Sequence, residues 1–168
     1  MVAPVVVAPS AFRRFASDRR GIGGVEFGIV GAAFFTLLLL AFETAWQMAV
    51  AAGLDQGARQ AARWVATGAA PPAGSTREAE VLRRISQSSG LPIDITRLSV
   101  STDSFTTLGS INTPAAARPG LGAAEAIVRY RVTYRAAALT PAARILLPLG
   151  EVSHAFTVLA RNEPYASP

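Results

Sequence analysis

The sequence has 168 residues but contains no cysteine and only one histidine, His154. The lack of cysteine excludes disulfide bonds and thiolate metal sites among these residues. A single histidine without a nucleophile motif gives no Ser-His-Asp arrangement, so we expect a packed structural role for His154. The acidic residues are scattered and lack metal-ligand spacing. The sequence therefore predicts no metal, no cofactor and no enzymatic activity.

Charge is also scarce: 16% of the residues are charged, whereas soluble chains average about 25%. All 16 basic residues are arginine. Four of them (Arg13, Arg14, Arg19 and Arg20) precede the longest apolar run, and the chain from Ile22 onward carries 12 arginines against 10 acidic residues. Because no continuous basic stripe is present, we do not expect nucleic-acid binding.

The charge deficit is explained by residues 22–42, an apolar run whose one charged residue is Glu26. About 20 apolar residues are needed for a helix to cross a bilayer. The run is longer than a signal-peptide core and no small-residue cleavage site follows it, so we predict a retained transmembrane helix. The arginines before it predict a cytoplasmic N-terminus and an exported remainder.

The helix is expected to continue to residue 67, because residues 43–67 lack proline and are rich in good helix formers. An apolar stripe recurs at helical spacing, and Asp55 and Arg59 are placed for an i,i+4 ion pair. Trp46 lies where interfacial tryptophan is common. Gly68 and the Pro71-Pro72 pair predict the end of this helix. The stripe comprises Leu54, Ala58, Ala61 and Val65.

The remaining residues predict a small α+β domain. Ser75 to Glu78 read as a capping box that opens a second helix through about Ser89, with Val81, Leu82 and Ile85 on its apolar side. Alternating patterns predict a sheet of about three strands, mostly antiparallel. The expected strands are 94–101, 126–135 and 151–161; residues 102–122 are expected to form a long loop, and residues 141–149 a short helix or loop packed on the sheet.

One ionisable residue, Glu26, lies near the start of the apolar helix. Such a residue is costly in a membrane and is a functional candidate, although a carboxylate this near the end could also reach the interface. Glu26 is the fifth residue after Gly21, and the aromatic Phe27 follows it. This order of features resembles the processing site of type IV prepilins: a basic leader, a glycine, four residues, a glutamate, an aromatic residue and a hydrophobic helix.

This pattern resembles the TadE-like family of the tight-adherence (Tad, Flp) pilus systems. The likeness covers Arg19 to Trp64, including the segment Ala58 to Trp64 at the end of the long helix. Ala160 to Pro164 are also similar to the family, and the residues between are not. The resemblance implies a minor pilin or pseudopilin with a pilin-like fold that acts in pilus assembly and surface adherence.

The resemblance also implies a maturation step, in which a membrane-embedded prepilin peptidase cuts between Gly21 and Ile22. The new amino group of Ile22 would pair with Glu26 of a neighbouring subunit. Gly24, Gly28 and Ala32 form a small-residue stripe that would permit close helix packing in lipid. Phe27 would belong to the recognition site.

The expected organisation is a leader (1–21), a transmembrane helix (22–42), its periplasmic continuation (43–67) and a periplasmic α+β domain (68–168). The expected location is the bacterial inner membrane, crossed once. Expected partners are the prepilin peptidase, other Tad pilins and pseudopilins, the inner-membrane Tad assembly platform and membrane lipid. Two alternatives remain open: an anchor for another envelope complex that keeps its leader, and a membrane-tethered periplasmic enzyme or binding protein.

Overall fold

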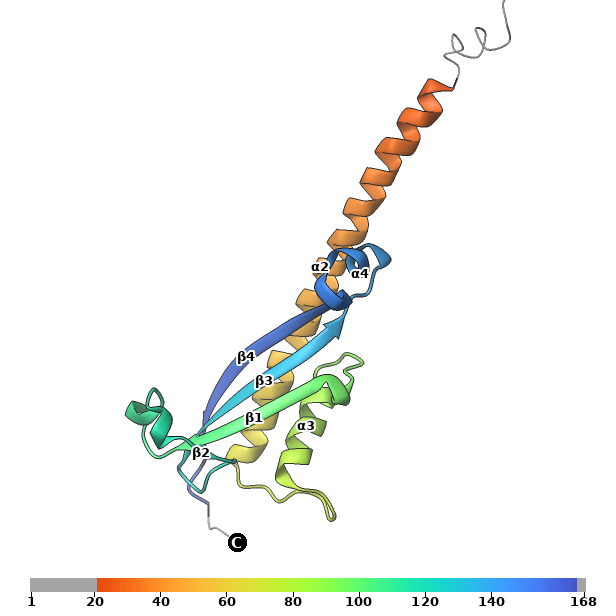
Figure 1. Cartoon of the computed structure of the whole chain (residues 1–168). Helices are drawn as coiled ribbons and strands as arrows, with labels where there is room; N and C mark the ends of the chain where they lie inside the picture. The colour runs from red at the N-terminus through yellow and green to blue at the C-terminus, as the bar shows by residue number, and fades with distance from the viewer. Residues whose placement is uncertain (1–20, 166–168) are drawn as a thin grey trace, which may run out of the picture. The chain divides into compact units, whose positions relative to one another are not determined.

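The computed structural model describes residues 21–165 (Figure 1). The predicted leader residues Arg13, Arg14, Arg19 and Arg20 lie outside this range. The first described element is helix α2, Ile22–Ala66, whose 45 residues confirm the predicted long helix. The structure divides into two compact units within this helix, between Leu39 and Leu40. Every other helix and strand that the structure describes lies in the second unit.

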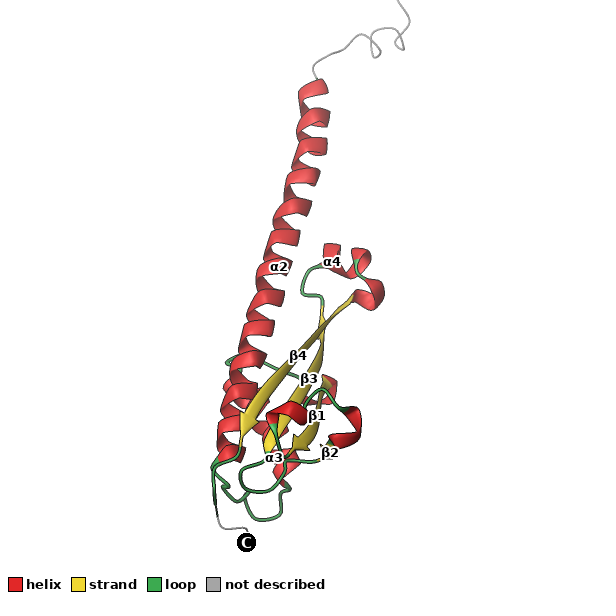
Figure 2. Ribbon diagram, turned by 90° about the vertical axis from the view of Figure 1, so that its left-hand side faces the viewer, coloured by secondary structure: helices red, strands yellow, loops and turns green. Residues whose placement is uncertain are grey.

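In the second unit, four antiparallel strands form one sheet in the order β2-β1-β3-β4. Strand β3 is central and pairs with β1 on one side and with β4 on the other (Figure 2). The prediction of an α+β fold with a mostly antiparallel sheet is confirmed. The strands are β1 (Leu98–Phe105), β2 (Arg118–Pro119), β3 (Ile127–Ala137) and β4 (Glu151–Arg161).

The core forms where α2, helix α3 (Arg77–Ser88) and one face of the sheet meet. The predicted apolar stripe of α2 is completely buried in this core: Leu54, Ala58, Ala61 and Val65 are each at most 1% exposed. Alternate residues of β3 complete the core from the sheet side, as the period of two requires. These β3 residues are Val128, Tyr130, Val132 and Tyr134, all buried.

Two glycines of α2 permit α3 to pack closely against it. A Cβ atom at Gly53 would lie 2.5 Å from the carbonyl oxygen of Ser89, and one at Gly57 would lie 2.5 Å from that of Ile85. No side chain fits at that separation, so the crossing of the two helices depends on glycine at both positions. The predicted pair of Asp55 and Arg59 is also present, with 2.9 Å between Arg59 Nε and Asp55 Oδ2.

Some predicted boundaries were wrong. The strand predicted over 94–101 begins at Leu98, because Asp94 accepts a hydrogen bond from the Thr96 N–H and caps a short 3₁₀ helix, Ile95–Arg97. The loop predicted over 102–122 contains the end of β1 and all of β2. The N-cap of α3 is Thr76 rather than Ser75, since the Thr76 hydroxyl accepts from the Ala79 N–H at 3.1 Å.

The segment between β3 and β4 forms helix α4, Pro141–Leu146, followed by a 3₁₀ turn, Pro148–Gly150. The expectation that its apolar residues pack on the sheet was wrong. Ala143 is the one buried residue of α4, whereas Ile145 is 84% exposed and Leu149 is 95% exposed. The helix itself is well specified, with Thr140 as N-cap and Pro141 at its first position.

Candidate processing and assembly site

The predicted cleavage point coincides with the first turn of α2. The helix begins at Ile22, and its first backbone hydrogen bond runs from the Val25 N–H to the Gly21 carbonyl oxygen at 3.2 Å. Gly21 is exposed, and a Cβ atom built on it would meet nothing within 4 Å. The described fold therefore does not require glycine at this position.

Glu26 and Phe27 lie on the second turn of the helix, and both side chains are exposed. Phe27 is 77% exposed. Ile22 and Glu26 are four residues apart, so they share one side of the helix. An amino group created at Ile22 would thus lie about one helical turn from Glu26.

The small residues Gly24, Gly28 and Ala32 follow each other at intervals of four, which places them on one face. All three are exposed, and a Cβ atom at either glycine would meet nothing within 4 Å. The face is therefore open to approach by another helix. Between these positions the helix carries large exposed apolar side chains, including Val25, Ile29 and Val30.

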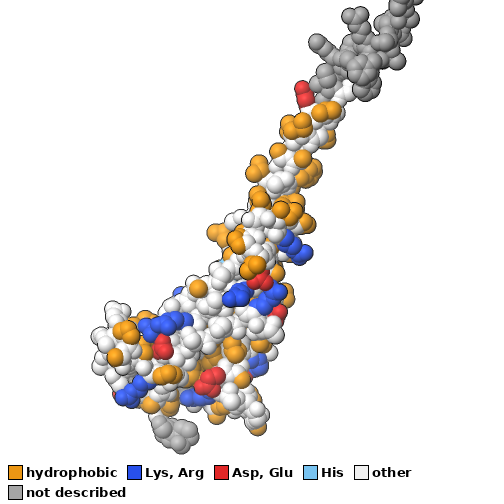
Figure 3. All heavy atoms as spheres, in the orientation of Figure 1, with side chains coloured by type: hydrophobic (Ala, Val, Ile, Leu, Met, Phe, Trp, Pro, Cys, Tyr) orange, Lys and Arg blue, Asp and Glu red, His pale blue; other side chains and the backbone are white. Residues whose placement is uncertain are grey.

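Hydrophobic side chains cover most of the face of this part of α2 that Figure 3 shows. The helix is long and apolar enough to cross a membrane, with a mean hydropathy of 2.2 over its most apolar 18 residues. Its one internal hydroxyl before Leu40, that of Thr36, donates to the Ala32 carbonyl oxygen at 2.8 Å and so needs no outside partner. These properties fit a single-pass membrane protein.

Residues 21–63 match the family model described as TadE-like protein. The predicted resemblance is confirmed. The TadE-like segment begins at Gly21 and includes each residue of the predicted processing and packing sites. The match does not extend over the α3 helix or the sheet. No curated protein and no solved structure matches the chain.

The TadE-like segment also carries a buried acidic residue that sequence reasoning missed. Glu43 is 5% exposed, and its Oε2 accepts hydrogen bonds from the backbone N–H of Leu139 at 2.9 Å and of Thr140 at 2.8 Å. Its Oε1 accepts from Gln47 Nε2 at 2.6 Å. Burial raises the pKa of Glu43, but these hydrogen bonds lower it more, so the net shift is below the ordinary value of 4.5.

The network continues from Gln47 to the sheet. Gln47 Oε1 lies 2.9 Å from His154 Nε2, and because the Gln47 amide already donates to Glu43, the imidazole is the donor. Burial lowers the pKa of His154 below its ordinary value of 6.5. A structural role for His154 is therefore supported by its contacts. Glu43, Gln47 and His154 together join α2 to β4 and to the start of α4.

The predicted family likeness of residues 160–164 lies outside the match, but these residues make contacts at the other end of the domain. Asn162 is 2% exposed, and its Nδ2 donates to the carbonyl oxygens of Leu121 at 3.0 Å and Ala123 at 2.8 Å. The Glu163 N–H donates to the Ala66 carbonyl oxygen at 2.8 Å, at the end of α2. The terminal segment thus fastens both the loop after β2 and the end of the long helix.

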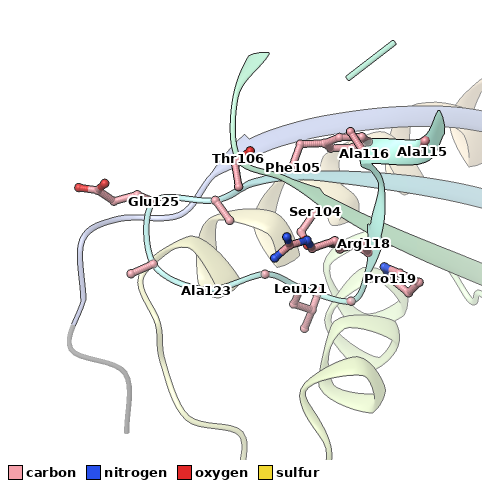
Figure 4. A pocket seen from close by; sticks show the side chains of 14 residues that line it. Ser104, Phe105, Thr106, Ala115, Ala116, Arg118, Pro119, Leu121, Ala123 and Glu125 are labelled. Carbon is pink, nitrogen blue, oxygen red and sulfur yellow. The ribbon is translucent and has the colours of Figure 1, made fainter. Parts of the chain in front are cut away.

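A cavity of about 660 Å³ lies between the end of β1 and residues 115–126 (Figure 4). Its charged lining residues are Arg118 and Glu125, and Figure 4 shows the Glu125 carboxylate directed away from the arginine. The Ser104 hydroxyl in its wall donates to the Arg118 carbonyl oxygen at 3.1 Å. The cavity brings together no acid–base pair and lends no support to the enzyme alternative.

Proposed function

We propose that this protein is a minor pilin or pseudopilin that acts in assembly of Tad pili. The observation that carries the proposal is the position of the TadE-like match, which starts at Gly21 and covers the apolar helix. The family implies interaction with other components of the Tad pilus. The matched segment supplies a membrane-crossing helix, and the unmatched remainder supplies α3 and the sheet, which form the folded domain together with the C-terminal part of α2.

In the proposed maturation step, a prepilin peptidase hydrolyses the Gly21–Ile22 peptide bond on the cytoplasmic side. Water adds at the carbonyl carbon, leaving a carboxylate on Gly21 and an ammonium group on Ile22. The helix dipole disfavours a cation at an N-terminus. The new ammonium group therefore needs an anion, and in a membrane Glu26 needs a cation. Pairing Glu26 of one subunit with Ile22 of the next meets both needs and links maturation to assembly.

The open face of Gly24, Gly28 and Ala32 supports this arrangement. Glycine costs about 0.5–1 kcal/mol relative to alanine within a helix. A Cβ atom added at either glycine would meet nothing within 4 Å among the described residues, so packing within the described part of the chain does not explain them. Close packing of a neighbouring pilin helix in lipid does, because small residues let two helix backbones approach.

Mature protein recovered from cells with an active prepilin peptidase provides the test. Its intact mass should correspond to a chain starting at Ile22. Gly21→Leu should abolish the mass change, because a bulky side chain precedes the cleaved bond. Gly23→Ala is the matched control: it changes an equally open glycine of the same turn and should leave processing intact. Wild-type protein that still starts at Met1 would contradict the proposal and favour the alternative anchor protein.

A further inference from the structure

We propose that the segment between β3 and β4 contacts the lipid bilayer directly, as a second membrane-binding element. Its exposed side chains form what we call the apolar apex: Leu139, Ile145, Leu146 and Leu149. This inference rests on the membrane-spanning part of the proposed function. It assigns to the folded domain a partner, the outer leaflet of the membrane, that the TadE-like segment alone does not require.

The first argument is exposure. The four apex residues are 54%, 84%, 64% and 95% exposed, in chain order, although they lie within eleven residues of one another. A cluster of large exposed apolar side chains is uncommon on a soluble surface and marks a binding site. Figure 2 shows α4 at the end of the sheet where β3 leads into β4, away from the core between α2 and the sheet.

The second argument is backbone strain. Leu149 has φ 59°, the left-handed conformation that β-carbon-bearing residues avoid. A glycine, Gly150, follows immediately and also has positive φ. Leu149 is thus held in an uncommon backbone conformation while its side chain is 95% exposed.

The third argument is the position of the apolar apex along the chain, which favours the membrane over a second copy of the protein as its partner. Glu43 is the first residue after the apolar run 22–42, and its carboxylate binds the backbone N–H groups of Leu139 and Thr140. The apex is thus held beside the helix where the run ends. Phe42, the last residue of the run, is 60% exposed in the same unit. The headgroup layer is about 5–7 Å thick on each side of the hydrocarbon core, so a segment bonded to residue 43 lies within it.

The charges around the apex fit the same partner. Arg144 and Arg135 are exposed near the ends of α4 and β3, and the Arg144 Nε donates to the Ala138 carbonyl oxygen at 3.1 Å. Apolar side chains with arginines beside them are the pattern of interfacial elements, which bury leucine and contact lipid phosphates.

Because the chain has no cysteine, single spin labels can test the proposal in the full chain reconstituted into phosphatidylethanolamine–phosphatidylglycerol vesicles. Labels are placed at Leu149→Cys, at Ile145→Cys, whose backbone is helical, at Leu38→Cys in the span and at Leu108→Cys. Leu108 is the matched control, an exposed leucine (72%) in the turn after β1. Collision with oxygen relative to a water-soluble nickel chelate reports lipid exposure.

We expect the ratio of oxygen to nickel-chelate collisions at Leu149→Cys and Ile145→Cys to be at least threefold higher than at Leu108→Cys. This difference should persist when the amount of lipid per protein is increased tenfold. Apex labels as water-exposed as Leu108→Cys, with Leu38→Cys in lipid, overturn this inference and leave the proposed function intact. A ratio that falls to the control value on dilution with lipid assigns the apex to another copy of the chain and also overturns it. Water exposure at Leu38→Cys would show that the helix does not cross the membrane, and this result would overturn both proposals.

Discussion

The N-terminal and C-terminal parts of helix α2 differ in what their residues contact, although the helix is continuous. In its C-terminal part, Gly53 and Gly57 are required by contacts with the backbone of α3. In its N-terminal part, a Cβ atom added at Gly24 or Gly28 would meet nothing within 4 Å among residues 21–165. Packing within the described chain thus explains the glycines of the C-terminal part and does not explain those of the N-terminal part. Where the chain itself gives no reason for a costly residue, the reason is to be sought in a partner.

The acidic residues repeat this contrast. Glu43 is buried and accepts hydrogen bonds from three N–H groups of its own domain. Glu26 is exposed in the apolar half, where membrane burial makes a charge costly without a partner. The Glu43 carboxylate organises the fold, and the Glu26 carboxylate is the one that we propose acts in assembly. The predictions below would break or sharpen this division.

The largest effect is expected from Glu26→Gln, which keeps size and polarity but removes the charge. The variant should insert and be cut after Gly21 at a similar rate, whereas cross-linking to other pilins and the number of pili should fall at least tenfold. Piliation counts and cross-linking yields in a strain carrying this variant alone provide the measurement. Normal piliation would sink the pairing of Glu26 with Ile22 and favour a glutamate that merely reaches the interface.

Matched glycine substitutions test the two halves of α2 directly. Gly57→Val should destabilise the folded domain by about 1–3 kcal/mol, as overpacking typically does, because its Cβ would overlap the Ile85 carbonyl. Gly28→Val should leave domain stability unchanged and reduce assembly. Denaturant unfolding of the full chain in detergent micelles, followed by tryptophan fluorescence, gives the free energies. Equal destabilisation by both substitutions would remove the distinction drawn here.

Glu43→Gln should destabilise the domain by about 1–3 kcal/mol, the usual cost of disrupting buried hydrogen bonds. The amide offers one acceptor oxygen where the carboxylate offers two, so the N–H groups of Leu139 and Thr140 and the Gln47 amide cannot all be satisfied. The same unfolding experiment measures the loss. Glu26→Gln is the control and should unfold like wild type; an unchanged Glu43→Gln variant would show that the network adds nothing to stability.

The smallest effect is a pH dependence caused by His154, whose pKa in the folded state is lowered by burial. Above pH 6.5 the imidazole is neutral in both states and its full contribution is present. As pH falls below 6.5 the unfolded chain takes up the proton first, so stability falls until the folded pKa is passed. The wild-type free energy of unfolding should decline over this range more steeply than that of His154→Gln. Parallel pH profiles of the two proteins would contradict the assignment.

The regular parts of the fold were predictable because their signals are local. The period of two in residues 126–135 and 151–161 and the stripe from Leu54 to Val65 each identify a buried face without reference to the rest of the chain. Sequence resemblance similarly identified the TadE-like segment, since its motif lies within a few helical turns. The processing and packing residues remain predictions, supported by their exposure and spacing.

Long-range polar contacts were not predictable. Nothing near Glu43 in the sequence indicates that its partners lie at Leu139 and Thr140. A single sequence shows residue types but not the pairing of distant groups. Strand β2 was not predicted because it is only two residues long, which is too short to show an alternating pattern.

The hydrogen bond between Glu163 and Ala66 has a consequence for how the protein is made. The last strand and the residues after it cover a helix that is synthesised about 100 residues earlier. If export proceeds from the N-terminal side, the apolar stripe of α2 emerges first and is only partly covered, by α3 and β3, until β4 arrives. Completion of the core is thus tied to the synthesis of β4, and contacts this distant in sequence form slowly. A chain truncated before Glu151 would leave part of this core exposed, which makes aggregation more favourable.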